Sequence, residues 1–204
     1  SRLSMESTKP TVTILPLTST REAALFHWKN WLSNSTADQA LDLALQQIPW
    51  RKDVIKMFGR TIQIPRLQNW FSESGQSYTY SRLSLPGLDY LEWMAYLSLD
   101  VKKTTQNDFN GILVNYYRDG SDSMDWHADD ESSLGVEPVI ASVSLGAERI
   151  FQLRHKVTRD RFNVSLTHGS LFLMGPGIQD YWQHRIAKAK NLTEPRISLT
   201  FRKL

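Results

Sequence analysis

The apolar positions near the start of the chain recur at helical intervals. Apolar side chains between Ala24 and Leu32 are spaced mostly by three or four residues, which places them on one face of a helix. Ser19 stands three residues before Glu22, the spacing of a capping box at a helix N-terminus. The pattern therefore predicts an amphipathic helix over residues 20–33.

Two further helices are expected in the first half of the chain. Residues 37–47 carry an apolar face and are followed by Pro49, which is typical of a helix that ends before a proline. The segment from Leu91 to Ser98 has the same period and predicts a helix that ends before Thr104.

The remaining segments alternate with the period of two that strands require. Between residues 50 and 84 such segments surround Ile62-Gln63-Ile64 and Tyr78-Thr79-Tyr80, and Phe58-Gly59-Arg60 is a candidate hairpin tip. After Asp108 almost every apolar run is short and bounded by Gly, Pro, Asp or Asn. These runs are Phe109 to Tyr117, Val139 to Leu145, Arg149 to Leu153, Phe162 to Leu166, Ser170 to Met174 and Ile197 to Phe201.

The order of these elements predicts the fold class. Helices come early and strands come late, which favours an α+β fold with helices backing one sheet of a sandwich or jelly roll, rather than an alternating parallel architecture. A chain of 204 residues is long enough for one core, so we expect a single domain over residues 1–204. Within it, residues 1–15 are expected to be flexible and residues 108–204 to form the β core.

Composition excludes several classes of protein and site. The chain has 41% hydrophobic and 22% charged residues and no cysteine, so disorder, a coiled coil, disulfides and thiolate metal ligands are not expected. No apolar run reaches the length of a membrane span, and the polar N-terminus does not look like a signal peptide. We therefore expect an intracellular protein, in the nucleus or the cytoplasm, without membrane contact.

The net charge of +3 is too small to identify a partner, but the cations are clustered. One cluster lies between Arg149 and Arg161 and the other between Arg51 and Arg66. Each cluster by itself is also consistent with an ordinary solvated face. Whether the clusters have a function depends on which candidate functional residues lie between them.

His127 and Asp129 are the first of these candidates. In an extended segment, residues two apart lie on the same face, so an imidazole and a carboxylate can meet one metal ion. His184, just before the last strand, is a candidate for a second imidazole. Two His and one carboxylate leave part of an octahedron open, as in non-haem Fe(II) oxygenases, although a hydrolytic zinc site uses similar ligands.

The last strand supplies independent evidence. Arg196, Ser198, Thr200 and Arg202 alternate with apolar residues, so two guanidinium groups share one face. A dicarboxylate would suit their forked donors. An exposed edge strand with ordinary charges is the competing interpretation.

Together these motifs resemble the AlkB family of Fe(II)- and 2-oxoglutarate-dependent dioxygenases. The resemblance covers roughly residues 48–204 and rests on Asn115-Tyr116-Tyr117, His127-Ala128-Asp129, His184 and the pair Arg196 and Arg202. It implies a double-stranded β-helix, with residues 48–84 as a nucleotide-recognition lid. Residues 122–131 and 196–202 are most similar to family members that favour single strands, whereas residues 57–66 are similar to members that repair duplex DNA.

The resemblance also implies roles for individual residues. His127, Asp129 and His184 would bind the iron and be catalytic. Five residues would bind the co-substrate 2-oxoglutarate, namely Asn115, Tyr117, Arg196, Thr200 and Arg202, with Arg196 on the distal carboxylate. Seven residues would bind the nucleic acid, namely Tyr78, Tyr80, Ser81, Glu131, Met57, Phe58 and Arg66. Among these, Tyr80 would stack on a flipped base, Glu131 would contact the base edge and Tyr78 would close the lid.

The implied activity is oxidative demethylation of alkylated bases such as 1-methyladenine and 3-methylcytosine in DNA or RNA. The reaction uses Fe(II), O2 and 2-oxoglutarate and releases formaldehyde, succinate and CO2. A monomer acting on methylated nucleic acid is expected. Two alternatives are a related dioxygenase acting on protein or a small molecule, and a non-enzymatic nucleic-acid-binding module.

Met57 and Phe58 decide between the two kinds of AlkB relative. If this pair forms an exposed wedge, its side chains would occupy the gap left by a base extruded from a duplex. The alternative is that the pair packs onto the protein's own core.

Overall fold

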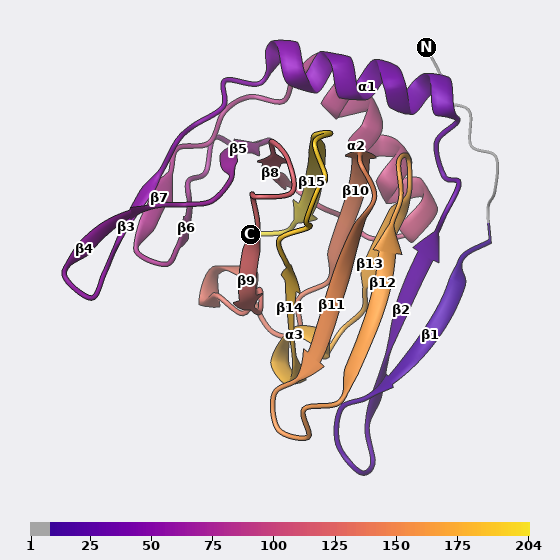
Figure 1. Ribbon diagram of the computed structural model, residues 1–204. Coiled ribbons are helices and arrows are strands. Elements are labelled where there is room, and N and C mark those ends of the chain that lie inside the picture. Colours follow the sequence, from indigo (N-terminus) through magenta and orange to yellow (C-terminus); the bar gives the residue numbers. More distant parts are fainter. Residues whose placement is uncertain (1–8) are drawn as a thin grey trace.

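Two antiparallel β-sheets pack face to face (Figure 1). The structure is a computed structural model that describes residues 9–204. The larger sheet has the spatial order β1 (Thr11–Pro16), β2 (Glu22–Trp28), β13 (Leu171–Met174), β10 (Ile140–Gly146), β15 (Arg196–Arg202), β8 (Gly111–Tyr117) and β5 (Leu67–Ser72). The smaller sheet has the order β12 (Arg161–Leu166), β11 (Arg149–His155), β14 (Trp182–Ile186) and β9 (Met124–His127).

An apolar core fills the space between the sheets. Leu153 and Trp182 of the smaller sheet pack there with Leu25, Ile140 and Phe172 of the larger one. The larger sheet is buried on its other face as well, which explains the uninterrupted burial of β5 and β13. The expected α+β jelly roll is therefore confirmed.

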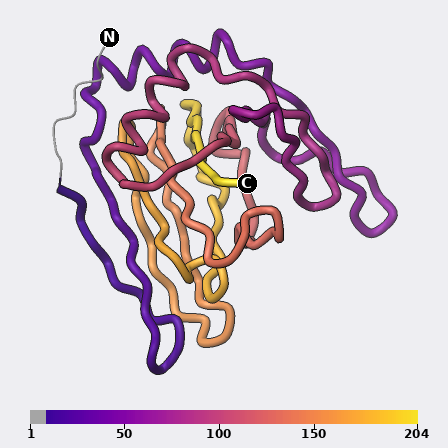
Figure 2. The backbone as a smooth tube through the Cα atoms, turned by 180° about the vertical axis from the view of Figure 1, so that it is seen from behind, coloured from indigo at the N-terminus to yellow at the C-terminus, as the bar shows by residue number. Residues whose placement is uncertain are grey.

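Two helices cover the outer face of the larger sheet, as predicted (Figures 1 and 2). They are α1 (Asn34–Gln47) and α2 (Glu92–Thr105). Ser33 caps α1, because its hydroxyl accepts a hydrogen bond from the Thr36 N–H. A single-turn helix, α3 (Ile178–Tyr181), precedes β14, and a 3₁₀ turn, η1 (Ser132–Leu134), follows β9.

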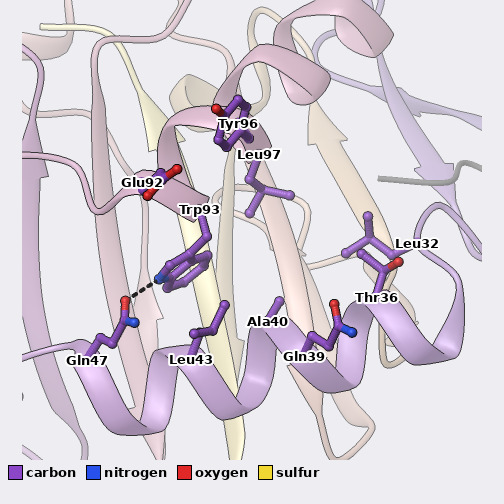
Figure 3. A pocket seen from close by; sticks show the side chains of 10 residues that line it. All are labelled: Leu32, Thr36, Gln39, Ala40, Leu43, Gln47, Glu92, Trp93, Tyr96 and Leu97. Carbon is purple, nitrogen blue, oxygen red and sulfur yellow. Dashed lines mark hydrogen bonds between the residues drawn. The ribbon is translucent and has the colours of Figure 1, made fainter. Parts of the chain in front are cut away.

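Between α1 and α2 lies an open groove of about 290 Å³ (Figure 3). Apolar side chains such as Leu43 and Leu97 line it beside Trp93, whose indole N–H donates to the Gln47 side chain. The groove has no cluster of metal-ligating residues and shares no lining residue with the cavities that contain His127 and Asp129.

Two hairpins project from one end of the sheets (Figure 1). The first pairs β3 (Val54–Met57) with β4 (Arg60–Gln63), and the second pairs β6 (Tyr78–Tyr80) with β7 (Leu83–Leu85). Phe58 and Gly59 connect β3 to β4, and both have positive φ (50° and 73°), as a two-residue primed hairpin turn requires. The predicted hairpin tip is therefore confirmed.

The helix predicted over residues 20–33 is wrong. Residues 22–28 form β2, which pairs with β1 on one side and β13 on the other. Ala23, Leu25 and Trp28 are buried by this pairing. Ser19 belongs to a turn in which the Thr18 hydroxyl accepts the Arg21 N–H, so the capping-box spacing marks no helix. Tertiary strand pairing outweighs the local period here.

Two predicted boundaries also need correction. Residues 11–15 were expected to be flexible, but they form β1 in register with β2, while residues 1–8 lie outside the described part of the chain. The predicted lid, residues 48–84, includes β5, which is fully buried in the larger sheet beside β8. A nucleotide-recognition lid would therefore be confined to the two hairpins. No helix among residues 9–204 is long and apolar enough to span a membrane.

Candidate metal and co-substrate site

Three metal-ligating side chains meet at one end of the smaller sheet. His127 ends β9 and lies directly opposite His184 of β14 in the strand register. Their ring centroids are 4.3 Å apart, and Asp129 Oδ2 lies 3.4 Å from His184 Nε2. One ligand atom from each of the three residues lies within 4.8 Å of the others. The three predicted ligands therefore lie together, and the register of β9 with β14 brings His127 and His184 side by side.

The triad is held in a state suited to a metal ion. His127 Nδ1 lies 2.7 Å from the Asp125 carbonyl oxygen, and since a carbonyl only accepts, Nδ1 carries the proton and Nε2 keeps its lone pair. Burial and the neighbouring His184 ring lower the pKa of His127 to about 3, so the imidazole is neutral. Burial opposes ionisation of Asp129, but Arg202 and the two imidazoles hold the pKa of that carboxyl well below its usual range. Neutral imidazoles and an ionised carboxylate are the ligand forms that bind metals.

Gln179, a buried residue of α3, supports two of the three ligands. Its Oε1 accepts the backbone N–H of Asp129 at 2.9 Å and lies 3.1 Å from His184 Nε2. Its Nε2 in turn donates to the Met174 sulfur. The sequence analysis did not identify this residue, because a glutamine five residues before a histidine carries no recognisable motif. Phe151, stacked on the His184 ring at 5.0 Å, was missed for the same reason.

The polar face of β15 borders the same space. β15 lies between β10 and β8, so the interpretation as an exposed edge strand is excluded. Arg196 is opposite Tyr117 and Ser198 is opposite Asn115, and directly opposed residues share a face of the sheet. All five predicted co-substrate residues line one narrow cavity together with the triad.

Arg196 is a buried cation without a described carboxylate partner. It is 2% exposed, its Nη2 donates to the Ser144 hydroxyl, and its Nε has no hydrogen-bond partner within residues 9–204. Its guanidinium lies 5.3 Å from the centre of the Tyr117 ring. Burial lowers the pKa of Arg196 to about 10, which shows that its charge is poorly compensated. An anionic ligand would compensate it.

Arg202 instead has an acidic partner already. Its Nη1 lies 2.8 Å from Asp129 Oδ1 and also donates to the Tyr78 hydroxyl at 3.0 Å. Its Nη2 donates to Thr200 Oγ1, which in turn donates to the Leu113 carbonyl. The Thr200 hydroxyl was expected to serve the co-substrate, but in the structure it is engaged in holding Arg202. Arg202 Nε is buried and has no partner among the described residues.

Arg149 lies beside Arg196, since both guanidinium groups approach the Tyr117 ring, at 5.4 and 5.3 Å from its centre. It is buried, and its guanidinium donates to the carbonyls of Asp119, Asp122 and Ala187. These carbonyls belong to the loops that follow β8 and β14. Arg149 was counted in a basic surface cluster from sequence, and that assignment is wrong because its donors face these carbonyls.

A second, larger cavity of about 850 Å³ opens on the hairpin side of the triad. It shares His127, Asp129 and Arg202 with the narrow cavity and is also lined by Tyr80 and Glu131. Ser81 lines it too, from the β6–β7 turn. Burial raises the pKa of the Glu131 carboxyl.

The two tyrosines of β6 differ in position. Tyr78 is 1% exposed, stacks on Trp70 and donates to Glu131, so it joins the hairpin to the core rather than closing over the site. Tyr80 is half-buried, and its hydroxyl donates to the Gln68 side chain, which fixes the ring at the wall of the larger cavity. Tyr80 is therefore not an ordinary core aromatic, since it lines the cavity in which the resemblance expects a base.

The remaining predicted nucleic-acid contacts fall into two groups. Arg66 is 7% exposed and donates to Asn115 and to the Ser123 carbonyl, so it lines the cavity but does not form part of a basic surface. Met57 and Phe58 are 44% and 95% exposed at the tip of the β3–β4 hairpin. The alternative in which this pair packs onto the core is therefore wrong.

Comparison with known proteins identifies the family. The profile described as the 2OG-Fe(II) oxygenase superfamily matches residues 24–202, which include the triad and both cavity arginines. The chain belongs to the 2OG-Fe(II) oxygenase superfamily. The oxygenase is 39% identical over 176 residues to "Alpha-ketoglutarate-dependent dioxygenase alkB homolog 3" of Mus musculus, an alignment that covers 81% of this chain and 61% of the relative. It is 36% identical over 158 residues to "DNA oxidative demethylase ALKBH2" of Mus musculus, covering 74% of this chain and 66% of the relative.

A solved structure described as "The structure of OsALKBH1" shares the fold. The TM-score is 0.63 at 18% identity, with 93% of this chain and all of the other chain covered. The AlkB resemblance is thus confirmed at the level of family and fold. The oxygenase spans about three fifths of the length of the alkB homolog 3 relatives that it matches.

The residues present fit the two groups in the family's description. Two imidazoles and one ionised carboxylate form a donor set suited to Fe(II). The unpartnered Arg196 Nε in the adjoining cavity fits the carboxylate of 2-oxoglutarate. His127, Asp129 and His184 would hold the metal, and Arg196 would hold the far end of the co-substrate.

Proposed function

We propose that this oxygenase removes methyl groups from alkylated bases in nucleic acid, using Fe(II), 2-oxoglutarate and O2. The observation that carries the proposal is the pair of adjoining cavities, one lined by buried arginine and the other by tyrosine and glutamate, with the metal-ligating residues between them. This arrangement gives the co-substrate and a base separate places on either side of one metal site.

When bound, Fe(II) and 2-oxoglutarate supply the oxidation of the N-methyl group by O2, with formaldehyde, succinate and CO2 as the other products. The residues of the chain bind, orient and exclude water. Arg196 binds the distal carboxylate through its forked donors. Asn115, Tyr117 and Arg202 complete the wall of the co-substrate cavity.

The base enters the larger cavity from the hairpin side. There Tyr80 offers a ring face for stacking, and Glu131 offers a carboxylate to the base edge. Bases such as 1-methyladenine and 3-methylcytosine carry positive charge, which an acidic neighbour favours. Ser81, in the β6–β7 turn, lies where the backbone next to the base would pass.

The hairpin tip favours a duplex substrate. Phe58 is almost fully exposed although its backbone is in the left-handed region, which costs about 1 kcal/mol or more for a bulky residue. An exposed aromatic ring on a strained turn is unfavourable for the free protein, and insertion into a base stack would give the ring a partner. The proposed substrate is therefore methylated DNA, with the duplex form served by Met57 and Phe58.

The test compares Asp129→Asn with the wild type on methylated oligonucleotide, methylated peptide and no substrate. We expect wild-type succinate and formaldehyde production to depend on added Fe(II) and on the oligonucleotide, and Asp129→Asn to lose it, because a neutral amide is a poor metal ligand. Asp38→Asn, an exposed carboxylate on α1, is the control and should retain activity.

A folding measurement accompanies this assay, since Asp129 also neutralises the buried Arg202. Loss of that partner should lower the free energy of unfolding by roughly 3 kcal/mol, so turnover is measured at a temperature where circular dichroism shows the variant folded. Turnover of the peptide but not of the oligonucleotide would contradict the proposed substrate. Near-normal demethylation by folded Asp129→Asn would contradict the metal site.

A further inference from the structure

A tryptophan surrounded by three arginines lies on the outer face of the smaller sheet. The guanidinium carbons of Arg154, Arg185 and Arg161 lie 4.1, 4.5 and 5.3 Å from the centre of the Trp126 ring. Neighbouring residues of a strand point to opposite faces, so Trp126 points away from the space that its neighbour His127 shares with His184. We call these four residues the Trp126 platform.

The positive charge of the platform is not neutralised. Arg154 Nη2 donates to the Gln183 side chain at 3.1 Å, and Arg185 Nε donates to the Gln152 side chain at 2.6 Å. Both acceptors are neutral amides, so they fix the guanidinium groups without cancelling their charge. Within residues 9–204 no carboxylate lies at ion-pair distance from any of the three arginines.

Holding these cations together is unfavourable for the free protein. Partial burial and three neighbouring guanidinium groups lower the pKa of Arg154, and its Nε is buried without a described partner. Stacking on the indole offsets part of the repulsion, since a cation over a tryptophan face gains about 0.5 to 1 kcal/mol at an exposed site. Each of these guanidinium groups has five N–H donors, and the glutamine side chains occupy only one donor each of Arg154 and Arg185, so donors remain for an anion.

The platform is continuous with the larger cavity. Trp126 and Arg185 line that cavity, as do Met57 and Tyr80 of the hairpins. β9, which carries Trp126, is the strand of the smaller sheet on the side of the hairpins (Figure 1). A chain that places one base in the cavity therefore has its backbone within reach of the platform.

The two basic clusters seen in the sequence do not provide an equivalent surface. Arg149 and Arg66 are buried and donate to groups inside the protein. Arg51 forms an ion pair with Asp53 at 2.9 Å. The platform instead combines two arginines of one cluster with Arg185, which strand pairing brings beside them.

We propose that the Trp126 platform binds the phosphodiester backbone of the nucleic acid next to the base held in the larger cavity. This inference rests on the proposed nucleic-acid substrate. Guanidinium forks match phosphate oxygens bidentately, and the excess of cations fits a polyanion rather than a single charge. The contacts are independent of base sequence, so the platform contributes affinity and not base selectivity.

The experiment measures binding and turnover separately. Arg154→Gln, Arg161→Gln and the double variant are titrated against a fluorescently labelled methylated single strand of about 15 nucleotides, over a series of salt concentrations. Turnover is measured on that strand and on a methylated trinucleotide whose linkages are uncharged methylphosphonates, so that it offers a base to the cavity but no anion to the platform. Lys29→Gln is the control, because this exposed lysine follows β2 near the opposite edge of the larger sheet.

We expect each single variant to weaken binding of the long strand by roughly fivefold at low salt. The slope of log affinity against log salt should fall by about 0.7 for each phosphate contact removed. Turnover of the trinucleotide and binding by Lys29→Gln should remain at wild-type values. The double variant should bind more weakly than either single variant, but the two losses should not simply add, because Arg154 and Arg161 are paired neighbours on the same indole.

If both single variants bind the long strand with wild-type affinity and salt slope, the inference is overturned. The platform would then be a candidate site for another polyanion, such as an acidic protein. Equal losses on the trinucleotide and the long strand would also overturn it, because the defect would then lie in the site itself. The proposed function fails in a different way. If the wild type demethylates neither oligonucleotide, the function is refuted, while the binding titration still reports on the platform.

Discussion

The double substitution Met57→Ala with Phe58→Ala tests whether the β3–β4 hairpin is a wedge for duplex nucleic acid. Phe58 is 95% exposed and Met57 is 44% exposed, so truncation removes little buried surface and should change the free energy of unfolding by less than about 0.5 kcal/mol. Alanine keeps the Cβ atom, and the cost of the left-handed backbone at residue 58 therefore stays the same. Any large effect must arise in the complex.

The expected loss of activity on duplex can be estimated from the surface of the Phe58 ring. Insertion of a phenyl ring into a base stack removes on the order of 150 Å² from water, with an upper limit of about 4 kcal/mol at roughly 25 cal/mol per Å². Truncation of aromatic side chains that stack on bases costs about 1 to 3 kcal/mol. We therefore expect kcat/KM on methylated duplex to fall by roughly 5- to 150-fold.

The assay uses the same methylated sequence as a duplex and as a single strand, with formaldehyde release as the readout. The single strand offers no gap to fill, so its kcat/KM should be unchanged. Val54→Ala is the matched control, since Val54 is also exposed and lies on the same hairpin, paired with Gln63 away from the tip. Equal losses on both substrates, or a large drop in Tm, would refute the wedge.

Two further predictions concern the interior of the site. Arg196→Lys keeps the charge but loses the planar fork, so we expect the binding free energy of 2-oxoglutarate to weaken by about 1 to 3 kcal/mol, measured by isothermal titration with Mn(II) in place of iron. Arg21→Lys is the control, because Arg21 lies in an exposed ion pair with Glu137. An unchanged affinity in Arg196→Lys would show that this arginine is only structural. Gln179→Leu removes the oxygen that positions Asp129 and His184, so Mn(II) affinity should fall by roughly 10- to 100-fold, whereas a loss of stability at wild-type metal affinity would contradict the positioning role.

The sequence predicted the site better than the element boundaries. His127, Asp129 and His184 were identifiable because an i, i+2 pair and a downstream imidazole are recognisable whatever the exact strand ends. The alternation along β15 likewise placed Arg196 and Arg202 on one face. The helix expected around Trp28 failed, because the pairing of β2 with β13 is a contact between residues more than a hundred positions apart, which a local period cannot report.

Sequence clusters of cations were a poor guide to the surface. Arg149 and Arg154 are five residues apart in β11, yet Arg149 donates to buried carbonyls while Arg154 stacks on Trp126. The odd separation places them on opposite faces of the strand. Arg185 joins the platform only through the register of β14 with β11, and register depends on which residues face the core along the whole sheet.

The exposed ring of Phe58 is also a hazard for the free protein, because apolar hairpin tips invite self-association. Lys56 and Arg60 flank the tip and are themselves exposed. Two copies of the hairpin cannot bring their rings together without bringing four cations together as well. Like charges beside an unavoidable apolar segment act as gatekeepers against aggregation, so Lys56 and Arg60 act against self-association of the hairpin when no nucleic acid is bound.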